Sequence, residues 1–157
     1  MAKKKDNKNL NPTIINRRAR FEFEFVTTFE AGIVLTGTEV KAIREGKVNL
    51  TDAFCYMRNG ELWLKNLHIS VYDNGTYNNH DPRSLRKLLL HKKELNKIDS
   101  KLKEKGLTVI PYKVYFSDRG FAKIEIALAT GKKTFDKRET IKARDSKRDL
   151  DRARRSM

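Results

Sequence analysis

NRRARFEFEFV, residues 16–26, places three arginines directly before a segment in which Phe and Glu alternate. Side chains of a β-strand point to opposite faces in turn, so this alternation predicts a strand around residues 20–28. The phenylalanines then share one face, and we expect Phe23 and Phe25 inside a core while the glutamates face water. A barrel or sheet therefore begins directly after a cationic arm.

Two helices are predicted farther along the chain. The first starts near Thr38 and closes at Gly46, because a capping hydroxyl and a glycine favour helix ends. The second covers residues 84–106, where aliphatic side chains recur at helical spacing before a glycine, with a bend near His91.

Turn signals divide the other apolar segments into hairpins. Asn59-Gly60 favours a tight hairpin, and residues 117–120 are expected to form the turn of a second one. Pro111 indicates an edge position or a bulge. We therefore predict a mainly β fold, an OB-fold-like β-barrel of about six antiparallel strands with two or three inserted helices.

The charge of the chain is concentrated at its ends. The 35 Lys and Arg against 20 Asp and Glu leave a formal net charge of +15. Residues 1–20 carry seven basic and one acidic side chains, residues 131–157 carry eleven and five, and residues 21–130 carry seventeen and fourteen. A polyanionic partner is therefore expected, with both ends of the chain in contact with it.

Three parts of the chain follow from this distribution. Residues 1–15 form a flexible basic arm, residues 16–130 the barrel, and residues 131–157 a basic tail. The tail has too few apolar side chains to offset the entropy of ordering, so we expect it to be disordered when free. Its oppositely charged pairs at three- and four-residue spacings favour a helix once a polyanion neutralises the cations. A merely solvated tail is the alternative.

Catalytic chemistry has little support. Cys55 is the only cysteine, so the chain alone forms neither a disulfide nor a Cys-based zinc site. The histidines are too far apart for a helical metal pair, and no phosphate-binding loop or nucleophile motif occurs. Asp73, Asp81 and Asp118 in loops leave a metal-dependent nuclease as an open alternative. No cofactor or metal is expected.

The compartment follows from the same features. A lone cysteine suits a reducing environment, and no apolar run is long enough for a secretion signal or a membrane span. We therefore expect a cytoplasmic protein.

Four blocks of sequence stand out together: NRRARFEF (16–23), FEAGIVLTGTEVKAIREGKVNLTDAF (29–54), DPRSLRKLLLHKKEL (81–95) and GKKTFDKRETIKARD (131–145). In this order they resemble the small protein B (SmpB) family of bacterial ribosome rescue. The resemblance implies a non-enzymatic barrel that binds the tRNA-like part of tmRNA and escorts alanyl-tmRNA, with elongation factor Tu, to a stalled ribosome. There the barrel stands at the decoding centre, and the tail enters the empty mRNA channel as a helix.

The resemblance also implies which residues contact RNA. Positions that match those used by the family toward tmRNA are Asn16, Glu30, Leu89 and Lys123. Cationic side chains that pair with phosphates, and a ring that stacks on a base, add Arg17, Arg18, Arg20, Phe21, Arg83, Arg86 and Lys87. The last three are expected on or beside one helical turn. In the tail, the expected ribosome-binding residues are Gly131, Lys132, Lys133, Phe135, Asp136, Lys137, Arg138, Lys142 and Arg144.

The leading hypothesis is therefore an RNA-binding rescue factor that acts as a monomer, with tmRNA, the ribosome and elongation factor Tu as partners and no membrane. A ribosomal or ribosome-assembly protein with basic tails is the main alternative. An affinity for tmRNA no higher than that for bulk tRNA contradicts the leading hypothesis.

Overall fold

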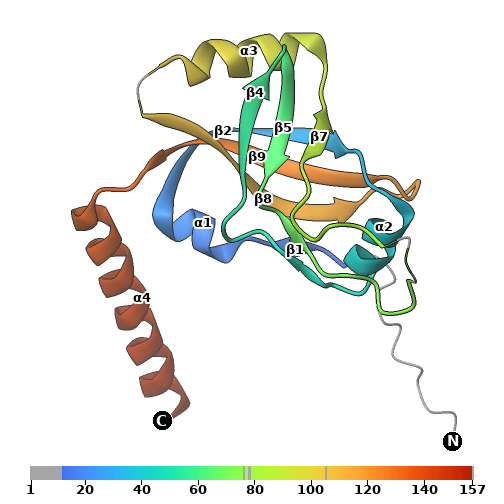
Figure 1. Ribbon diagram of the computed structural model, residues 1–157. Helices are drawn as coiled ribbons and strands as arrows, with labels where there is room; N and C mark the ends of the chain where they lie inside the picture. The colour runs from blue at the N-terminus through green and yellow to red at the C-terminus, as the bar shows by residue number, and fades with distance from the viewer. Residues whose placement is uncertain (1–11, 76, 78, 105, 157) are drawn as a thin grey trace, which may run out of the picture.

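The computed structural model describes residues 12–75, 77, 79–104 and 106–156 as a β-barrel with one long helix projecting from it (Figure 1). Residues 1–11 of the predicted arm lie outside this description. In chain order the elements are β1 (Ile14–Ile15), α1 (Arg17–Glu22), β2 (Phe23–Ile33), α2 (Gly37–Arg44), β3 (Val48–Asn49), β4 (Phe54–Arg58), β5 (Glu61–Lys65), β6 (His68–Ile69), β7 (Arg86–Leu89), α3 (Lys92–Leu102), β8 (Leu107–Phe116), β9 (Ala122–Gly131) and α4 (Thr134–Arg155).

Six strands close the barrel. They follow one another in the order β8-β4-β5-β7-β2-β9, and β9 pairs again with β8. Every pairing in this ring is antiparallel. The short β1 extends the sheet beside β8, and β3 pairs with β6 in a separate small sheet. This arrangement confirms the predicted OB-like antiparallel barrel, in which closure removes exposed sheet edges.

The main core fills the inside of the barrel. Ile124, Ile126 and Leu128 of β9 point inward and are almost completely buried. Two helices contribute to the same core, α2 through Ile43 and α3 through Ile98, and Figure 1 shows α3 across one end of the barrel. Each such side chain gains about 1.5–3 kcal/mol from burial, which makes the barrel a rigid support for groups on its outer face.

Both predicted hairpins are confirmed. Asn59 and Gly60 join β4 to β5 with φ angles of 52° and 75°, the positive values that a tight hairpin turn requires. The turn over residues 117–120 joins β8 to β9. The register of that hairpin shifts just after Pro111, so the predicted bulge is also present.

The first predicted helix is also confirmed, although its cap lies two residues earlier than expected. Thr36 is the N-cap of α2, and the Glu39 side chain accepts a hydrogen bond from its backbone N–H at 2.9 Å. Gly46, with a φ of 77°, follows the end of the helix, as predicted.

The opening stretch folds differently from the prediction. Residues Arg17–Glu22 form α1, and β2 starts only at Phe23. A bulge lies between Phe25 and Thr27, so the strand changes faces there. Phe23 and Phe25 are therefore outside the barrel, half-buried against Ala19 of α1 in a second small cluster, and the prediction that they lie in the barrel core is wrong.

The second predicted helix is wrong in its first half. Residues Arg86–Leu89 form β7, which fills the gap in the barrel between β5 and β2. The helix α3 begins only after His91, where the Glu94 carboxylate accepts the His91 backbone N–H at 3.2 Å. Pairing with two strands outweighs the helical spacing of the leucines, because tertiary contacts override local propensity.

The tail forms one long helix in the structure. α4 extends over Thr134–Arg155 and points away from the barrel (Figure 1). Disorder of the free tail and its folding on the ribosome stay a prediction. Residues 137–156 bury no side chain completely, so the helix adds little to the core of the barrel.

Candidate nucleic-acid interface

A one-and-a-half-turn helix presents the N-terminal arginines. Asn16 caps α1: its Oδ1 accepts the backbone N–H of Ala19 at 3.2 Å. Ala19 packs inward against the small cluster, and Arg17, Arg18 and Arg20 are exposed. A short amphipathic helix on the barrel therefore displays all three guanidinium groups to solvent.

Asn16 itself does not face solvent. It is only 7% exposed, and its Nδ2 donates to the carbonyl oxygens of Leu50 and Pro111 at 3.2 and 3.3 Å. Both ends of its amide bond to the protein, and the expectation that Asn16 contacts RNA stays a prediction. Its role is to hold α1 on the barrel.

Arg20 is held against two aromatic rings. Its guanidinium carbon lies 5.3 Å from the centroid of the Phe25 ring and 4.8 Å from that of Tyr112. The two rings meet edge to face at 5.2 Å. Cation–π contacts of this kind are worth about 0.5–2 kcal/mol and leave the guanidinium N–H groups free to donate. The charge is therefore pre-positioned for an anion.

The two charged ends of the chain meet at α1. The Lys132 backbone N–H donates to the carbonyl oxygen of Glu22, and Lys132 Nζ donates to that of Arg20, both at 2.9 Å. Farther along the tail, the Arg144 guanidinium carbon lies 5.8 Å from the ring centroid of Phe21. Phe21 is thus half-buried beside α4 and is not a freely exposed ring. We call this group of cations from both ends the cationic corner: Arg17, Arg18, Arg20, Lys132 and Arg144.

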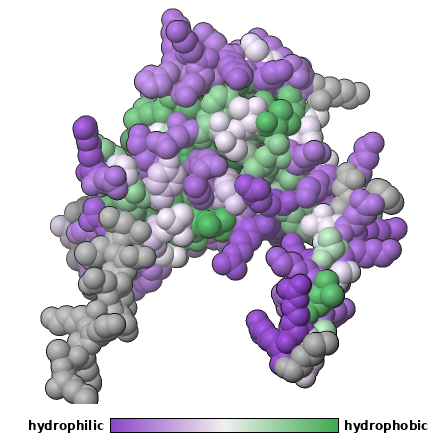
Figure 2. Space-filling view, turned by 180° about the vertical axis from the view of Figure 1, so that it is seen from behind, coloured by the Kyte–Doolittle hydropathy of each residue, from purple (hydrophilic) through white to green (hydrophobic). Residues whose placement is uncertain are grey.

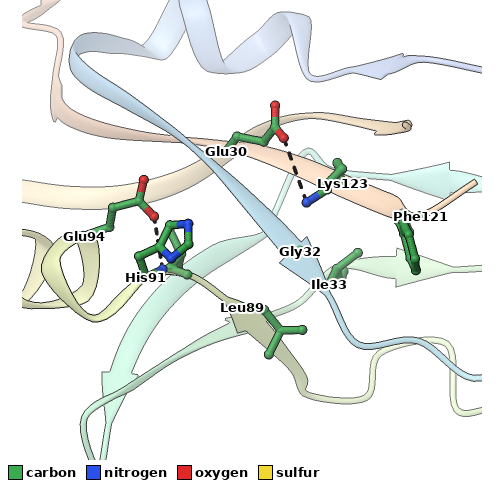
Figure 3. Close-up of a pocket in the computed structure, with 10 residues that line it drawn as sticks. Glu30, Gly32, Ile33, Leu89, His91, Glu94, Phe121 and Lys123 are labelled. Carbon is green, nitrogen blue, oxygen red and sulfur yellow. Dashed lines mark hydrogen bonds and ion pairs between the residues drawn. The ribbon is translucent and has the colours of Figure 1, made fainter. Parts of the chain in front are cut away.

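An open hollow of about 580 Å³ lies on another part of the barrel surface (Figure 3). It brings together Glu30 of β2, Leu89 of β7 and Lys123 of β9, three residues named from the family resemblance in distant parts of the sequence. Glu30 and Leu89 are 59% and 52% exposed, so both present their side chains to a ligand. The rest of the lining comprises Gly32, Ile33, Leu90, His91, Glu94, Phe121 and Ala122.

The polar groups of this hollow are linked. Lys123 Nζ lies 4.0 Å from Oε1 of Glu30, and the hydroxyl of Tyr115 donates to Oε2. Partial burial, the hydrogen bond to Glu30 and the negative charges of Glu30 and Glu125 raise the pKa of Tyr115 well above its ordinary value, so it stays a donor. The hollow therefore offers a carboxylate acceptor, a cation and apolar surface side by side, a combination suited to an unstacked base next to a phosphate.

One predicted contact residue is inside the protein. Arg86 is 2% exposed, its guanidinium lies 2.8 Å from the Glu39 carboxylate, and it donates to the carbonyl oxygen of Leu67 at 2.7 Å. The expectation that Arg86 extends the basic surface is wrong, because β7 is a strand and turns alternate side chains inward. Its neighbour Lys87 points outward and pairs with Glu61 at 2.7 Å.

Arg83 is exposed, but it lies elsewhere. It lines a smaller hollow of about 230 Å³ together with four polar side chains, which are Asn49, Asp52, Asn66 and His68. Arg83, Arg86 and Lys87, which were expected on or beside one helical turn, are thus far from equivalent. Arg83 lines the small hollow, Arg86 is buried against Glu39, and Lys87 pairs with Glu61 on the surface.

The remaining predicted residues are on the tail. Lys133, Arg138, Lys142 and Arg144 are exposed, Lys137 is half-buried, and Gly131 ends β9 opposite Phe23. The side chains of Phe135 and Asp136 lie outside the described part of the structure. Figure 2 shows the projecting helix as a rod covered mainly by hydrophilic side chains. Among its described residues the surface is mostly charged, with Ile141 and Leu150 as exposed apolar side chains.

Sequence reasoning missed Tyr115 and Phe121. The sequence around Tyr115 indicates no more than a strand. Its place beside Glu30 depends on the pairing of β8 with β9 and of β9 with β2. Phe121 is 64% exposed at the end of the 117–120 turn. An aromatic residue directly after a predicted turn was the available signal for it.

The acidic residues of the nuclease alternative are not gathered. Asp73 pairs with Lys47 at 2.6 Å, and Asp81 accepts the backbone N–H of Arg83 at 2.9 Å. Within the described ranges, no cluster of three or more His, Cys, Asp or Glu side chains is arranged to hold a metal ion. No helix in the same part of the chain is long and apolar enough to span a membrane.

A closed antiparallel barrel with cationic and aromatic groups on its outer face places this chain in the class of nucleic-acid-binding barrel proteins. Comparison with known proteins gives the family. The family model described as "SmpB protein" matches residues 13–156, and the chain belongs to this family.

Individual relatives agree over nearly the whole length. The "SsrA-binding protein" of Cytophaga hutchinsonii is 54% identical over 154 residues, which cover 98% of this chain and 99% of the relative. That of Gloeothece citriformis is 57% identical over 139 residues, 88% of this chain and 89% of the relative. A chain in the solved structure described as "tmRNA-SmpB: a journey to the center of the bacterial ribosome" is 53% identical, with a TM-score of 0.68 over 78% of this chain and 86% of that one.

Proposed function

We propose that this chain binds tmRNA and brings it to stalled ribosomes in trans-translation. The observation that carries the proposal is the convergence of Glu30, Leu89 and Lys123, from three distant segments, on one hollow of the barrel. Two SsrA-binding proteins are 54% and 53% identical to this chain over 98% of its length. This similarity supports tmRNA, which is also called SsrA RNA, as the bound RNA. The proposed activity is recognition, without a chemical step on the RNA.

The two surface regions suit one folded RNA. The cationic corner begins beside Phe23 and the hollow includes Glu30, so the two lie about 23 Å apart along β2, at roughly 3.3 Å per residue. Guanidinium and ammonium groups at the corner would position the phosphate backbone, while the hollow would read an unstacked base and its sugar. The barrel thus serves as a rigid grip on the tRNA-like part of tmRNA.

The tail has a second role in this proposal. α4 projects from the corner with Lys137, Arg138 and Lys142 on its surface. A cationic helix about 33 Å long, at 1.5 Å per residue, suits a channel walled by RNA such as the empty mRNA path of the small ribosomal subunit. The proposed partners further include elongation factor Tu through alanyl-tmRNA. The proposed acting form is a monomer, and the proposed place of action is the cytoplasm.

Binding to the isolated tRNA-like fragment tests the proposal. The dissociation constant should be at least tenfold lower for this fragment than for bulk tRNA at the same salt. Glu30→Gln, Leu89→Ala and Lys123→Ala should each raise it by about tenfold, the effect of one charge-assisted or well-packed contact. Lys103→Ala is the matched charge control, because Lys103 is exposed at the end of α3 and outside the hollow.

Equal affinity for both RNAs, or equal effects of Lys123→Ala and Lys103→Ala, would contradict the proposal. The alternative of a ribosomal or assembly protein is separated by fractionation of growing cells. A stoichiometric presence on translating ribosomes in cells without tmRNA would favour that alternative.

A further inference from the structure

Tyr115, Glu30 and Lys123 lie close together on three adjacent strands, β8, β2 and β9, at the edge of the hollow. Tyr115 of β8 is the register partner of Lys123 on β9, and Glu30 of β2 lies opposite Glu125 of β9. The Tyr115 hydroxyl donates to Oε2 of Glu30, and Lys123 Nζ stands 4.0 Å from Oε1. The Glu30 carboxylate is therefore held at one oxygen by the Tyr115 hydroxyl, while the Lys123 ammonium stays at a distance from the other oxygen. Figure 3 shows the Glu30–Lys123 ion pair.

The wide separation of Glu30 from Lys123 is unusual for this surface. Lys113 and Glu125 are register partners next to the Tyr115–Lys123 pair, and the Lys113 Nζ lies 3.1 Å from the Glu125 carboxylate. The Nζ of Lys87 lies 2.7 Å from the Glu61 carboxylate. A charge-assisted N–H···O contact normally closes to about 2.7–2.9 Å. In a closed pair, each charge of the hollow would satisfy the other and neither would be left for a ligand.

We infer that Tyr115 is a positioning residue of the RNA site, which holds Glu30 toward β8 and so keeps Glu30 and Lys123 from closing on each other. Oε1 of Glu30 then remains an acceptor for amino or hydroxyl donors of an RNA nucleotide, and the ammonium of Lys123 remains free for a phosphate. This inference rests on the proposed function of the hollow.

Salt dependence separates this role from a purely structural one. Each phosphate contact contributes about 0.7–0.9 to the slope of log affinity against log salt. If removal of the hydroxyl lets Lys123 close on Glu30, one phosphate contact is lost and the slope falls by about that amount. A mere loss of packing or rigidity lowers affinity without changing the number of ions released.

The experiment uses the full chain and the tRNA-like fragment of tmRNA at several salt concentrations. Tyr115→Phe should raise the dissociation constant about tenfold and lower the salt slope by about 0.7–0.9. Adding Glu30→Gln to Tyr115→Phe removes the charge that captures Lys123, so the slope should return to that of the unchanged chain. Tyr56→Phe, which removes a hydroxyl on β4 outside the hollow, should change neither quantity.

Three results would overturn the inference. One is an unchanged slope in Tyr115→Phe, whatever the unfolding midpoint of that variant. A second is a slope in the double variant that stays as low as in Tyr115→Phe. A third is the absence of any effect of Glu30→Gln and Lys123→Ala, which would also contradict the proposed function, whereas the first two would leave it standing.

Discussion

The guanidinium of Arg86 lies 2.8 Å from the carboxylate of Glu39, with both side chains buried, and this pair joins β7 to α2. The two residues are 47 positions apart in the sequence. The second oxygen of Glu39 accepts the backbone N–H of Thr36, so one carboxylate both caps a helix and neutralises the buried cation. The GTEVK and RKLLL segments are thus bound to each other inside the protein.

Arg86→Met should destabilise the fold strongly. Removing one partner of a buried ion pair leaves the other charge uncompensated, which costs about 3–5 kcal/mol. Urea unfolding measures this loss as a change in the free energy of unfolding. The control is Lys87→Met, which breaks an exposed pair on the next residue and should cost about 0–1 kcal/mol. Equal costs for the two variants would show that the buried pair does not hold α2 to β7.

Asn16→Ala should act through stability. Loss of the cap and of two buried bonds to the carbonyl oxygens of Leu50 and Pro111 should cost about 2 kcal/mol, and RNA binding should fall because α1 loosens. Asn16→Ser keeps a capping oxygen and should cost less. Thermal unfolding and RNA titration of both variants check this. Weaker RNA binding by Asn16→Ala with unchanged stability would instead indicate a direct contact.

Truncation after Lys133 should separate the two activities. It keeps the contacts of Lys132 with α1 and removes only α4, so the free energy of unfolding should change by about 0.5 kcal/mol or less. Affinity for the tRNA-like fragment should fall only by the contribution of Arg144, the one cation of the corner that is removed, while peptide tagging on stalled ribosomes should be abolished. Loss of both RNA binding and peptide tagging in this variant would contradict the proposal that the barrel binds tmRNA while the tail acts on the ribosome. Truncation after Gly131, which also removes Lys132, should weaken both stability and RNA binding.

Stability should fall at alkaline pH because of Cys55. Burial raises the pKa of this thiol above its ordinary value of 9.0, so above pH 9 the unfolded chain releases a proton that the folded chain keeps. The stability contributed by the buried neutral thiol is complete below pH 9. It is lost as the pH rises further, by about 1.4 kcal/mol per pH unit.

Chemical denaturation between pH 8 and pH 10 measures this slope. Cys55→Ala should flatten it, and Cys55 of the folded chain should react with iodoacetamide only as fast as the protein unfolds. A slope that is the same with and without the thiol would contradict the assignment. Tyr115, whose pKa is also raised, contributes in the same direction only above pH 10.

Local signals in the sequence were sufficient for the turns, for α2 and for the antiparallel pattern. Asn59-Gly60 and the residues 117–120 form hairpins because the backbone angles of a tight turn depend on the few residues that make it. Glu30, Leu89 and Lys123, which were named from resemblance and not from geometry, line one hollow, and their contact with RNA stays a prediction.

Two of the errors arise where strand pairing decides the outcome. Residues Arg86–Leu89 have a helical pattern, yet they are a strand because the barrel has a place for one between β5 and β2. Val26 lies at a bulge that no pattern in the segment reveals, and this one residue moves Phe23 and Phe25 to the outer face.

By itself, the sequence determined the barrel class, the hairpins and the concentration of cations at both ends, because backbone turns, side-chain alternation and charge are properties of short segments. Only the tertiary structure decided that those ends meet at α1, that Arg86 and Asn16 are buried, and that Tyr115 stands beside Glu30. Such relations depend on strand register and barrel closure, which bring together residues that no local spacing connects.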